Sequence, residues 1–292
     1  MRTQSTGIAV LPSGFLFATV ANNKSITSGS FFMALSDTTE IYQFPCLNDN
    51  FGVLMHDSDS GTTIAFDVPD ASTYLNALKE KDWQLTHILI THHHWDHVQG
   101  LGELKQATTA NVCGPARSRQ KIPELDRTVD DGDHILCGPY RIKAIATPGH
   151  TLDQISWYLP DVKIAHTGDT LFSLGCGRVF EGDKEMMWSS LEKLESELPD
   201  DTVIYCGHEY TEANAKFALT IDPGNSDLMA RAAEVAKLRS RGEPTLPTTM
   251  AQEKATNPFL RAAEASVAQA LGMEGKPAAE VFSEIRTRKD NA

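Results

Sequence analysis

The sequence predicts mixed helices and sheets, of either the α/β or the α+β class, followed by a smaller helical unit. Short runs rich in Val, Ile, Leu and aromatic residues alternate with helical patterns from Ile41 to about His208. After His208, strand-like runs become rare and apolar residues recur at helical spacing. This change indicates a small second domain or an appended lobe over roughly the last eighty residues.

The predicted strands are short apolar runs broken by Gly, Asp and Pro. They are Gly52–Met55, Thr63–Phe66, Leu85–Ile90, Tyr140–Ala146, Ile155–Leu159, Lys163–His166 and Val203–Tyr205. Helices are predicted at Ala71–Lys81 and Asp183–Leu198 between these strands, and at Thr211–Ile221, Ser226–Arg241, Asn257–Leu271 and Ala279–Thr287 after them.

Composition and charge argue against several classes of protein. A net charge of -13 and a pI of about 5.2 suit phosphate backbones poorly, so nucleic acid is not expected as a partner. No apolar run is long enough to span a bilayer, so we expect no membrane insertion. The five cysteines are scattered and lack a Cys-x-x-Cys pair, which favours a reducing, cytoplasmic location without a disulfide framework.

The first residues differ from the rest of the chain. Residues 1–36 contain no Asp or Glu, and Gly7–Val20 is fairly apolar after Arg2, so residues 1–32 could be a weak targeting segment. Pro12 and Gly14 interrupt that apolar run. We favour the simpler interpretation that Met33 is the true start, and we predict that residues 1–38 form an N-terminal extension that is disordered or not native.

The motif Thr91-His92-His93-His94-Trp95-Asp96-His97 predicts a metal site. In an extended backbone, alternate residues His92, His94 and Asp96 converge on one side, and His97 points elsewhere. Imidazoles and carboxylates from one short loop can be divided between two neighbouring ions. A string of this kind arises by chance in roughly one sequence per thousand, so coincidence is a poor explanation.

Three further candidate ligands follow predicted strands. His150 lies in the turn Thr147–Thr151, Asp169 follows Lys163–His166, and His208 follows Val203–Tyr205. Each signal is weak alone, because a single His or Asp at a strand end is more often structural. Together they indicate loops that gather one site on a rigid scaffold.

These motifs resemble those of the metallo-β-lactamase fold superfamily and, within it, the glyoxalase II or hydroxyacylglutathione hydrolase family. The resemblance includes Pro148-Gly149-His150-Thr151, Gly168-Asp169-Thr170, Gly175-Cys176-Gly177-Arg178, Gly207-His208-Glu209-Tyr210 and Asn257-Pro258-Phe259. It runs from about Ile41 to near the C-terminus. It implies an α+β fold, with an αββα metallo-β-lactamase sandwich over residues 39–210 and a helical glutathione-binding domain over residues 211–292.

The resemblance also implies two divalent metal ions, zinc first, with iron or manganese as alternatives that the same ligand types allow. The implied ligands of the first ion are His92, His94 and His150. Those of the second are Asp96, His97 and His208, with Asp169 bridging both ions. His93 is then the non-ligand of the triple histidine, and His56, His87, His134 and His166 match no ligand position.

The reaction implied by the resemblance is hydrolysis of S-D-lactoylglutathione, or another 2-hydroxyacylglutathione, to D-lactate and glutathione, a step of methylglyoxal detoxification. A hydroxide shared by the two ions attacks the thioester, and Asp96 and Asp169 serve as the catalytic carboxylates. The thiolate leaving group, with a pKa near ~8.5, needs no strong general acid. The expected partner is this small molecule alone, bound by a monomer.

The same resemblance assigns the substrate contacts to Arg178, Phe180, Tyr210, Arg286 and Lys289. Arg286 and Lys289 match a pair that binds the glycine carboxylate of glutathione through charge-assisted hydrogen bonds. Two positions depart from the common pattern, because many relatives have Lys at the position of Arg178 and Tyr at that of Phe180. Arg keeps the charge with a different geometry, and Phe lacks a hydroxyl that could donate to the tripeptide.

Two alternatives remain open at this stage. A persulfide dioxygenase-like relative would bind a single iron through His92, His150 and Asp169. A non-catalytic metal-binding relative could keep the fold without the activity, since fold alone does not prove function. A β-lactamase, which would need a clear signal peptide, and an RNA-processing nuclease, which would need a basic patch, fit this sequence less well.

Overall fold

The computed structural model of the chain describes residues 31–34 and 38–292. Its strands are β1 (Phe31–Ala34), β2 (Thr39–Cys46), β3 (Asn50–Asp57), β4 (Thr62–Phe66), β5 (His87–Leu89), β6 (Asn111–Pro115), β7 (Arg127–Val129), β8 (His134–Cys137), β9 (Tyr140–Ala146), β10 (Ile155–Leu159), β11 (Ile164–His166), β12 (Leu171–Phe172), β13 (Gly175–Cys176), β14 (Val203–Tyr205) and β15 (Thr248–Thr249). Its α-helices are α1 (Ala71–Lys81), α2 (Trp95–Val98), α3 (Leu101–Thr108), α4 (Lys184–Glu197), α5 (Thr211–Ile221), α6 (Ser226–Ser240), α7 (Met250–Thr256), α8 (Ala265–Leu271) and α9 (Ala278–Asp290).

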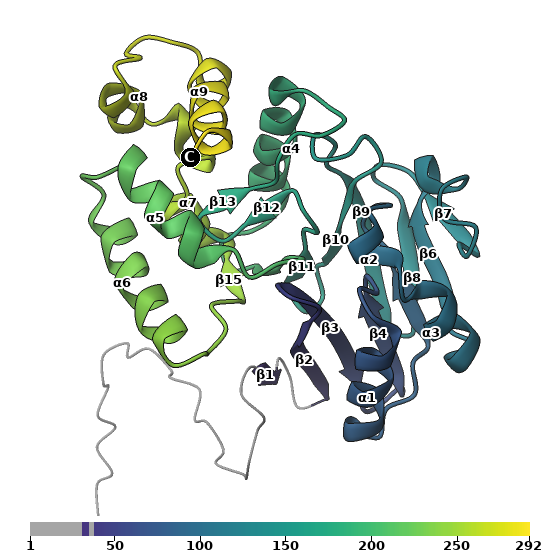
Figure 1. Cartoon of the computed structure of the whole chain (residues 1–292). Helices are drawn as coiled ribbons and strands as arrows, with labels where there is room; N and C mark the ends of the chain where they lie inside the picture. The colour runs from purple at the N-terminus through teal and green to yellow at the C-terminus, as the bar shows by residue number, and fades with distance from the viewer. Residues whose placement is uncertain (1–30, 35–37) are drawn as a thin grey trace, which may run out of the picture.

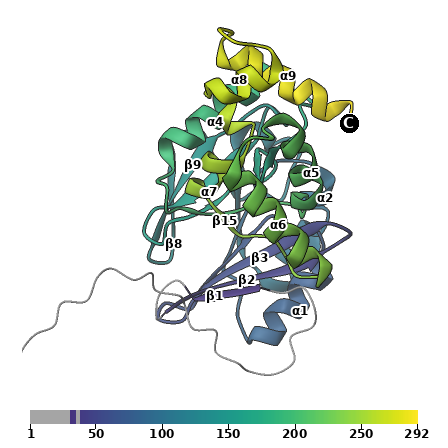
Figure 2. The same cartoon turned by 90° about the vertical axis from the view of Figure 1, so that its left-hand side faces the viewer.

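Two sheets form the centre of the molecule. The first follows chain order from β1 to β7, and the second has the order β15-β14-β11-β10-β9-β8. A short hairpin, β12-β13, stands apart from both sheets. Helices α1 and α3 lie on the outer side of the first sheet, and the C-terminal helices gather on the opposite side of the molecule (Figures 1 and 2).

Alternating side chains explain why the two sheets stack. In β9, Ile142 and Ala144 pack into the core between the sheets, whereas Ile145 packs on the other face against α4. Trp157 of β10 and Phe66 of β4 are fully buried in the core between the sheets. The predicted αββα sandwich followed by helices is therefore confirmed.

Most predicted elements lie where local sequence signals put them. Helix α1 coincides with its predicted range because Asp70 caps its first turn, accepting a hydrogen bond from the Thr73 N–H. The prediction of one helix over Asn257–Leu271 is wrong. Helix α7 ends at Thr256, a 3-10 turn covers Leu260–Ala263, and α8 begins at Ala265. The Asn257 side chain turns into the core there, and Pro258 has no N–H for a helix interior.

The predicted N-terminal extension, residues 1–38, falls mostly outside the described residues, although Phe31–Ala34 form β1 and pair with β2. The boundary at residue 210 stays a prediction, and β15 from the C-terminal part joins the second sheet beside β14. Among the described residues, no helix has both the length and the hydropathy needed to cross a membrane. All five cysteines are buried and free.

Buried polar contacts fasten the β12-β13 hairpin to the C-terminal helices. The Asn257 side-chain amide donates to the carbonyl oxygens of Phe172 and Gly175, at 3.1 and 3.0 Å. Glu253, fully buried, accepts hydrogen bonds from Leu174 N–H at 2.8 Å and Thr248 Oγ1 at 2.7 Å. The motif Asn257-Pro258-Phe259 therefore helps to place the segment that leads to Arg178.

We predict that Glu253→Ala lowers the free energy of unfolding by about 3 kcal/mol, because it leaves buried donors without an acceptor. Urea unfolding followed by circular dichroism measures this change. Glu253→Gln keeps a carbonyl acceptor and should cost roughly half as much. A loss below about 1 kcal/mol for Glu253→Ala would show that this network contributes little to stability.

Candidate metal centre and adjoining pocket

The histidine motif begins extended and ends helical. Thr91 follows β5, and its N–H and hydroxyl donate to the Asp67 carboxylate at 2.7 and 2.8 Å. His94 then caps helix α2, and His97 N–H donates to His94 O at 2.9 Å. The expectation that His97 points elsewhere is wrong, because this helical turn brings its ring to 4.2 Å from that of His92.

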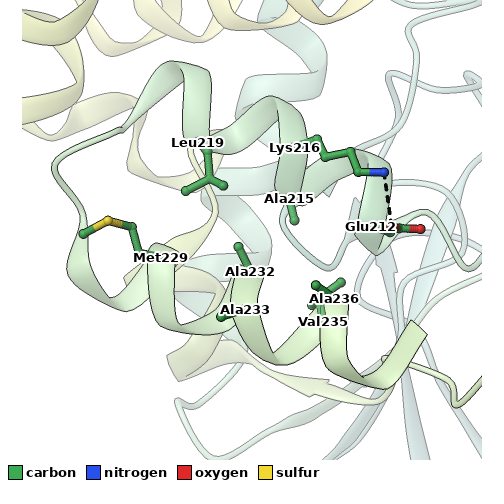
Figure 3. Close-up of a pocket in the computed structure, with 9 residues that line it drawn as sticks. All are labelled: Glu212, Ala215, Lys216, Leu219, Met229, Ala232, Ala233, Val235 and Ala236. Carbon is green, nitrogen blue, oxygen red and sulfur yellow. Dashed lines mark ion pairs between the residues drawn. The ribbon is translucent and has the colours of Figure 1, made fainter. Parts of the chain in front are cut away.

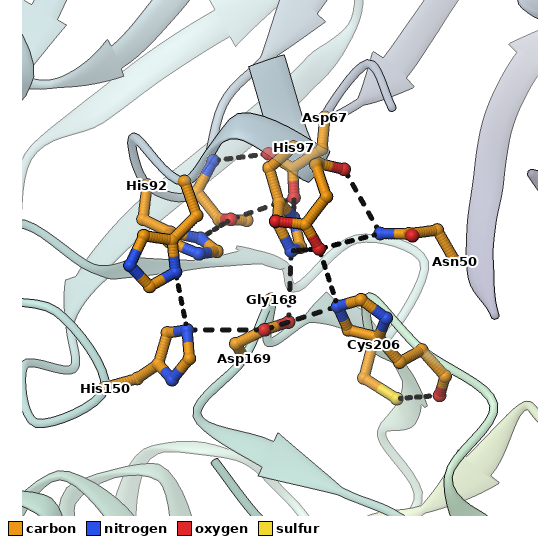
Figure 4. Close-up of polar contacts among 12 residues, drawn as sticks. Asn50, Asp67, His92, His97, His150, Gly168, Asp169 and Cys206 are labelled. Carbon is orange, nitrogen blue, oxygen red and sulfur yellow. Dashed lines mark hydrogen bonds and ion pairs between the residues drawn. The ribbon is translucent and has the colours of Figure 1, made fainter. Parts of the chain in front are cut away.

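The other candidate ligands come from the second sheet. Asp169 follows β11 and His208 follows β14, and these strands are parallel, so their carboxyl ends meet at one edge of the sheet. His150 follows β9, and its Nε2 lies 2.9 Å from His94 Nδ1 and 3.4 Å from Asp169 Oδ2. The two sheets therefore bring together residues that are far apart in the chain (Figure 4).

The structure gathers the predicted ligands into two triplets that share a carboxylate. His92, His94 and His150 form one triplet, and Asp96, His97 and His208 form the other. Asp169 lies between them, with Oδ1 at 3.3 Å from His97 Nε2 and Oδ2 at 3.4 Å from His208 Nε2. Within each triplet, one ligand atom per residue lies within 4.8 Å of the others.

Several buried atoms in this cluster have no hydrogen-bond partner. They are His92 Nε2, His97 Nε2 and Asp169 Oδ1. Buried polar atoms are nearly always paired, so their convergence indicates that a cation belongs among them. Gly207 keeps the space open, because a Cβ there would lie 2.6 Å from Asp169 Oδ1 and 2.6 Å from His97 Cε1. Imidazole nitrogens and carboxylate oxygens at this spacing fit divalent metal ions.

The charges in the cluster also suit a metal. Burial lowers the pKa of His92 well below its ordinary value, so this imidazole stays in the neutral form that binds metals. Burial opposes ionisation of Asp169, but His97 and His208 hold the pKa of that carboxyl well below its usual range. For His208, burial alone would lower the pKa, but the Asp169 and Asp96 carboxylates together have the larger effect. The pKa of His208 is therefore raised to about 10. A metal ion would displace the proton on this imidazole.

Oxygen atoms behind the ligands fix their rings. His97 Nδ1–H donates to Asp67 at 2.8 Å, His208 Nδ1–H to Asp49 at 2.9 Å, and His150 Nδ1–H to Arg178 O at 2.8 Å. Such contacts select the tautomer that presents Nε2 to a metal. Sequence reasoning missed Asp49 and Asp67, although the position of Asp67 directly after β4 was an available signal.

The other histidines lie outside this centre. His93 turns away from the ligands, and its Nδ1 lies 2.8 Å from Asp153 Oδ2. Among the described residues, His56, His87, His134 and His166 belong to no group that could hold a metal. His166 stacks on Phe66 with ring centroids 5.2 Å apart, and burial lowers its pKa to about 4.

A pocket of about 460 Å³ opens beside the metal centre. All five predicted substrate contacts line it, together with ligands from both triplets: Arg178, Phe180, Tyr210, Arg286, Lys289, His94, Asp96, His150, Asp169 and His208. The Tyr210 ring stacks on His208 at 4.7 Å, and the Phe180 ring lies 5.3 Å from His150. Sequence reasoning did not find Asn214, which also lines the pocket and donates to Ser173 O at 3.1 Å.

The cationic side chains of the pocket differ in burial and in how far they are already paired with other groups of the protein. Arg286 is 2% exposed, donates to Cys176 O at 3.0 Å, and pairs with Asp290 at 2.8 Å. Lys289 is half-buried, donates to Ala213 O at 3.3 Å, and lies 5.0 Å from the Phe217 ring centroid. Arg178 is exposed. Lys289 and Arg178 are therefore better able to meet an anionic ligand than Arg286, which also anchors the hairpin.

A second pocket, of about 470 Å³, lies between α5 and α6 (Figure 3). Its walls are mostly alanines and aliphatic side chains, and its ion pair joins Lys216 to Glu212 at 3.1 Å. None of the predicted site residues lines it. The predicted substrate contacts therefore lie in the pocket beside the metal centre and not in this second pocket.

Comparison with known families divides the chain into two matched parts. Residues 58–208 match the metallo-beta-lactamase superfamily. Residues 209–292 match the family described as hydroxyacylglutathione hydrolase C-terminus. The first match contains six of the candidate ligands and His208 at its end, and the second contains Tyr210, Arg286 and Lys289.

Individual relatives give the same grouping. The hydroxyacylglutathione hydrolase of Brucella anthropi is 53% identical over 257 residues, covering 88% of this chain and 98% of that protein. That of Brucella ovis is 53% identical over 251 residues, covering 86% and 97%. Among solved structures, ETHE1 from Myxococcus xanthus matches with a TM-score of 0.58 and 27% identity over 90% of both chains. The B3 metallo-beta-lactamase BLEG-1, with a TM-score of 0.58, 20% identity and coverage of 75% and 98%, shares the fold.

We predict that His94→Ala lowers the metal content of the purified protein by about one ion per chain, because it removes a first-triplet ligand. His93→Ala should leave the metal content unchanged, because its ring points toward Asp153 instead. Elemental analysis by mass spectrometry measures both, with circular dichroism as the check on folding. The reverse result would refute this assignment of the three consecutive histidines.

Proposed function

The chain belongs to the hydroxyacylglutathione hydrolase family of the metallo-beta-lactamase superfamily, and from this premise we propose that it hydrolyses S-D-lactoylglutathione to D-lactate and glutathione. Other 2-hydroxyacylglutathiones belong to the same substrate class. The observation that carries the proposal is that five of the seven candidate metal ligands line the same pocket as the cations Arg178 and Lys289.

The number and identity of the metals are part of this proposal. We infer two ions, with zinc as the first candidate. The triplet of His92, His94 and His150 would hold one ion, the triplet of Asp96, His97 and His208 would hold the other, and Asp169 lies close to both triplets. When bound, such ions lower the pKa of a shared water and stabilise negative charge on a carbonyl oxygen. The second triplet, like the first, has its ligand atoms within 4.8 Å of one another and adjoins the Asp169 carboxylate, which favours two ions over the single iron of a dioxygenase-like relative.

The residues of the chain supply the rest of the chemistry. Arg178 and Lys289 offer positive charge to the carboxylates of glutathione. Tyr210 lines the pocket beside His208, on whose ring it stacks. The leaving thiolate, with a pKa of about 8.5, departs without a strong acid. Burial raises the pKa of Cys176, the cysteine in this pocket, to about 11, so it stays a thiol and does not compete as a nucleophile.

The oligomeric state and the cellular location of the enzyme are proposed on separate grounds. We propose an active monomer, because a single chain holds both ligand triplets and the cations of the pocket. Five free, buried cysteines support a reducing compartment such as the cytoplasm. Arg178 and Phe180, in place of the commoner Lys and Tyr, keep a cation but remove a hydroxyl, so the hydrogen bond that this hydroxyl would donate to the tripeptide is lost.

We predict that the purified protein hydrolyses S-D-lactoylglutathione, as measured by loss of thioester absorbance, and that a chelator abolishes the activity. Added zinc should restore it. Turnover that persists in a protein shown to be metal-free would contradict the metal-dependent reaction. An inactive protein that carries two metals would exclude this substrate.

We predict that Lys289→Ala raises KM for S-D-lactoylglutathione by roughly tenfold and leaves kcat within about twofold, because it removes a charged contact far from the reacting bond. Lys289→Arg keeps the charge and should recover most of the affinity. Steady-state kinetics over a range of substrate concentrations separates the two parameters. An unchanged KM for Lys289→Ala would remove this residue from the glutathione site.

A further inference from the structure

A second polar cluster lies beside the metal centre and contains none of its candidate ligands. His93 Nδ1 lies 2.8 Å from Asp153 Oδ2, and His93 Nε2 lies 3.1 Å from Lys121 Nζ. Asp153 has a side chain only 2% exposed and also accepts a hydrogen bond from the Ser118 hydroxyl. Glu181 completes the cluster, with Oε1 at 3.3 Å from Lys121 Nζ and 3.4 Å from His93 Nε2.

The chemistry of these groups fixes their hydrogen bonds. An ammonium group can only donate, so His93 Nε2 accepts from Lys121, and His93 Nδ1–H donates to Asp153. His93, Asp153 and Glu181 are of residue types that could bind a metal. However, Lys121 already supplies the positive charge, and His93 turns a different nitrogen to each carboxylate. The cluster therefore acts as a connection between segments of the chain.

Glu181 joins this cluster to the segment that lines the substrate pocket. Its Oε2 accepts from Leu152 N–H at 2.9 Å. The backbone N–H groups of Phe180 and Glu181 both donate to His150 O, at 3.2 and 3.3 Å. Segment 178–182 is thus tied to the His150 loop by its backbone and to Lys121 and Leu152 by the Glu181 carboxylate.

We propose that Lys121, His93 and Glu181 form a clasp that holds segment 178–182 over the metal ligands, and that Glu181 is a positioning residue for binding of the thioester. The proposal rests on the proposed function, because Arg178 and Phe180 on this segment line the substrate pocket. It also gives a role to His93, the histidine of the motif that binds no metal. Lys121, His93 and Glu181 do not line the substrate pocket, so they act on the substrate only by holding segment 178–182 in place.

Because the clasp is partly exposed, we expect it to affect KM more than the global stability of the protein. The side chains of Lys121 and Glu181 are 45% and 30% exposed, and ion pairs this exposed contribute little to global stability. Their effect is local, because they restrict a segment that must be ordered when substrate binds. Loosening the segment should therefore raise KM, while the metal ligands and kcat stay as they are.

Three variants test the clasp: Lys121→Met, Glu181→Gln and Glu181→Ala. We expect Lys121→Met and Glu181→Gln to raise KM for S-D-lactoylglutathione about fivefold, with kcat within about twofold and metal content unchanged. Glu181→Ala should have the larger effect, because it also removes the acceptor for Leu152 N–H. The double variant Lys121→Met/Glu181→Gln should be little worse than Lys121→Met alone, since both substitutions break the same ion pair between Lys121 and Glu181.

Lys216→Met is the matched control, because Lys216 forms a comparable exposed ion pair with Glu212 in the pocket of Figure 3. It should leave KM unchanged. A KM that rises as much in the control, or that stays at the wild-type value in Glu181→Ala, would overturn the positioning role. Loss of metal from Glu181→Ala would also overturn it, by showing that Glu181 supports the ligands instead.

Amide hydrogen exchange provides a test that does not depend on turnover. The amides of Phe180 and Glu181 should exchange faster in Lys121→Met and Glu181→Ala than in the wild-type protein and the control. Unchanged exchange would refute the clasp itself. If the wild-type protein fails to hydrolyse S-D-lactoylglutathione, the proposed function fails, and the exchange rates still decide whether the clasp exists.

Discussion

The burial of one ionised carboxylate, that of Asp169, is the constraint on which the rest of the site depends. Asp169 is only 5% exposed, and its carboxylate oxygens lie within 3.4 Å of imidazole nitrogens from both triplets. An isolated carboxylate at this depth would be strongly destabilising, so the surrounding cations must compensate it. The stacking of two sheets is what brings their strand ends, and hence these imidazoles, around one aspartate.

The support around the ligands comes in two parts with different purposes. Behind the rings, Asp67, Asp49 and the carbonyl of Arg178 fix the nitrogen that each imidazole presents. In front of them, the hairpin β12-β13 and the segment after it form the wall of the pocket, held by Asn257 from the C-terminal part. The helical C-terminal part therefore supplies Lys289 and also shapes the approach to the metals.

Sequence reasoning predicts those features that depend on local signals. Helix α1 has its own cap, and α5 has its own helical pattern, so both ranges are predicted in full. Four candidate ligands are predicted from the dense motif Thr91–His97, and His150, Asp169 and His208 are assigned through the family resemblance. In contrast, the break at Asn257 depends on carbonyl oxygens more than eighty residues away, and the inward turn of His97 depends on a helix of four residues. Lys121 and Glu181 are 60 residues apart, so no local pattern indicates that they meet.

The claim that Asp169 serves two metal ions is tested most directly by diffraction from crystals of the zinc-loaded protein, with anomalous data collected at the zinc edge. We expect two anomalous peaks per chain, one among His92, His94 and His150 and one among Asp96, His97 and His208, each in contact with the Asp169 carboxylate. A single peak at full zinc loading, or two peaks of which Asp169 touches neither, would contradict the two-ion centre.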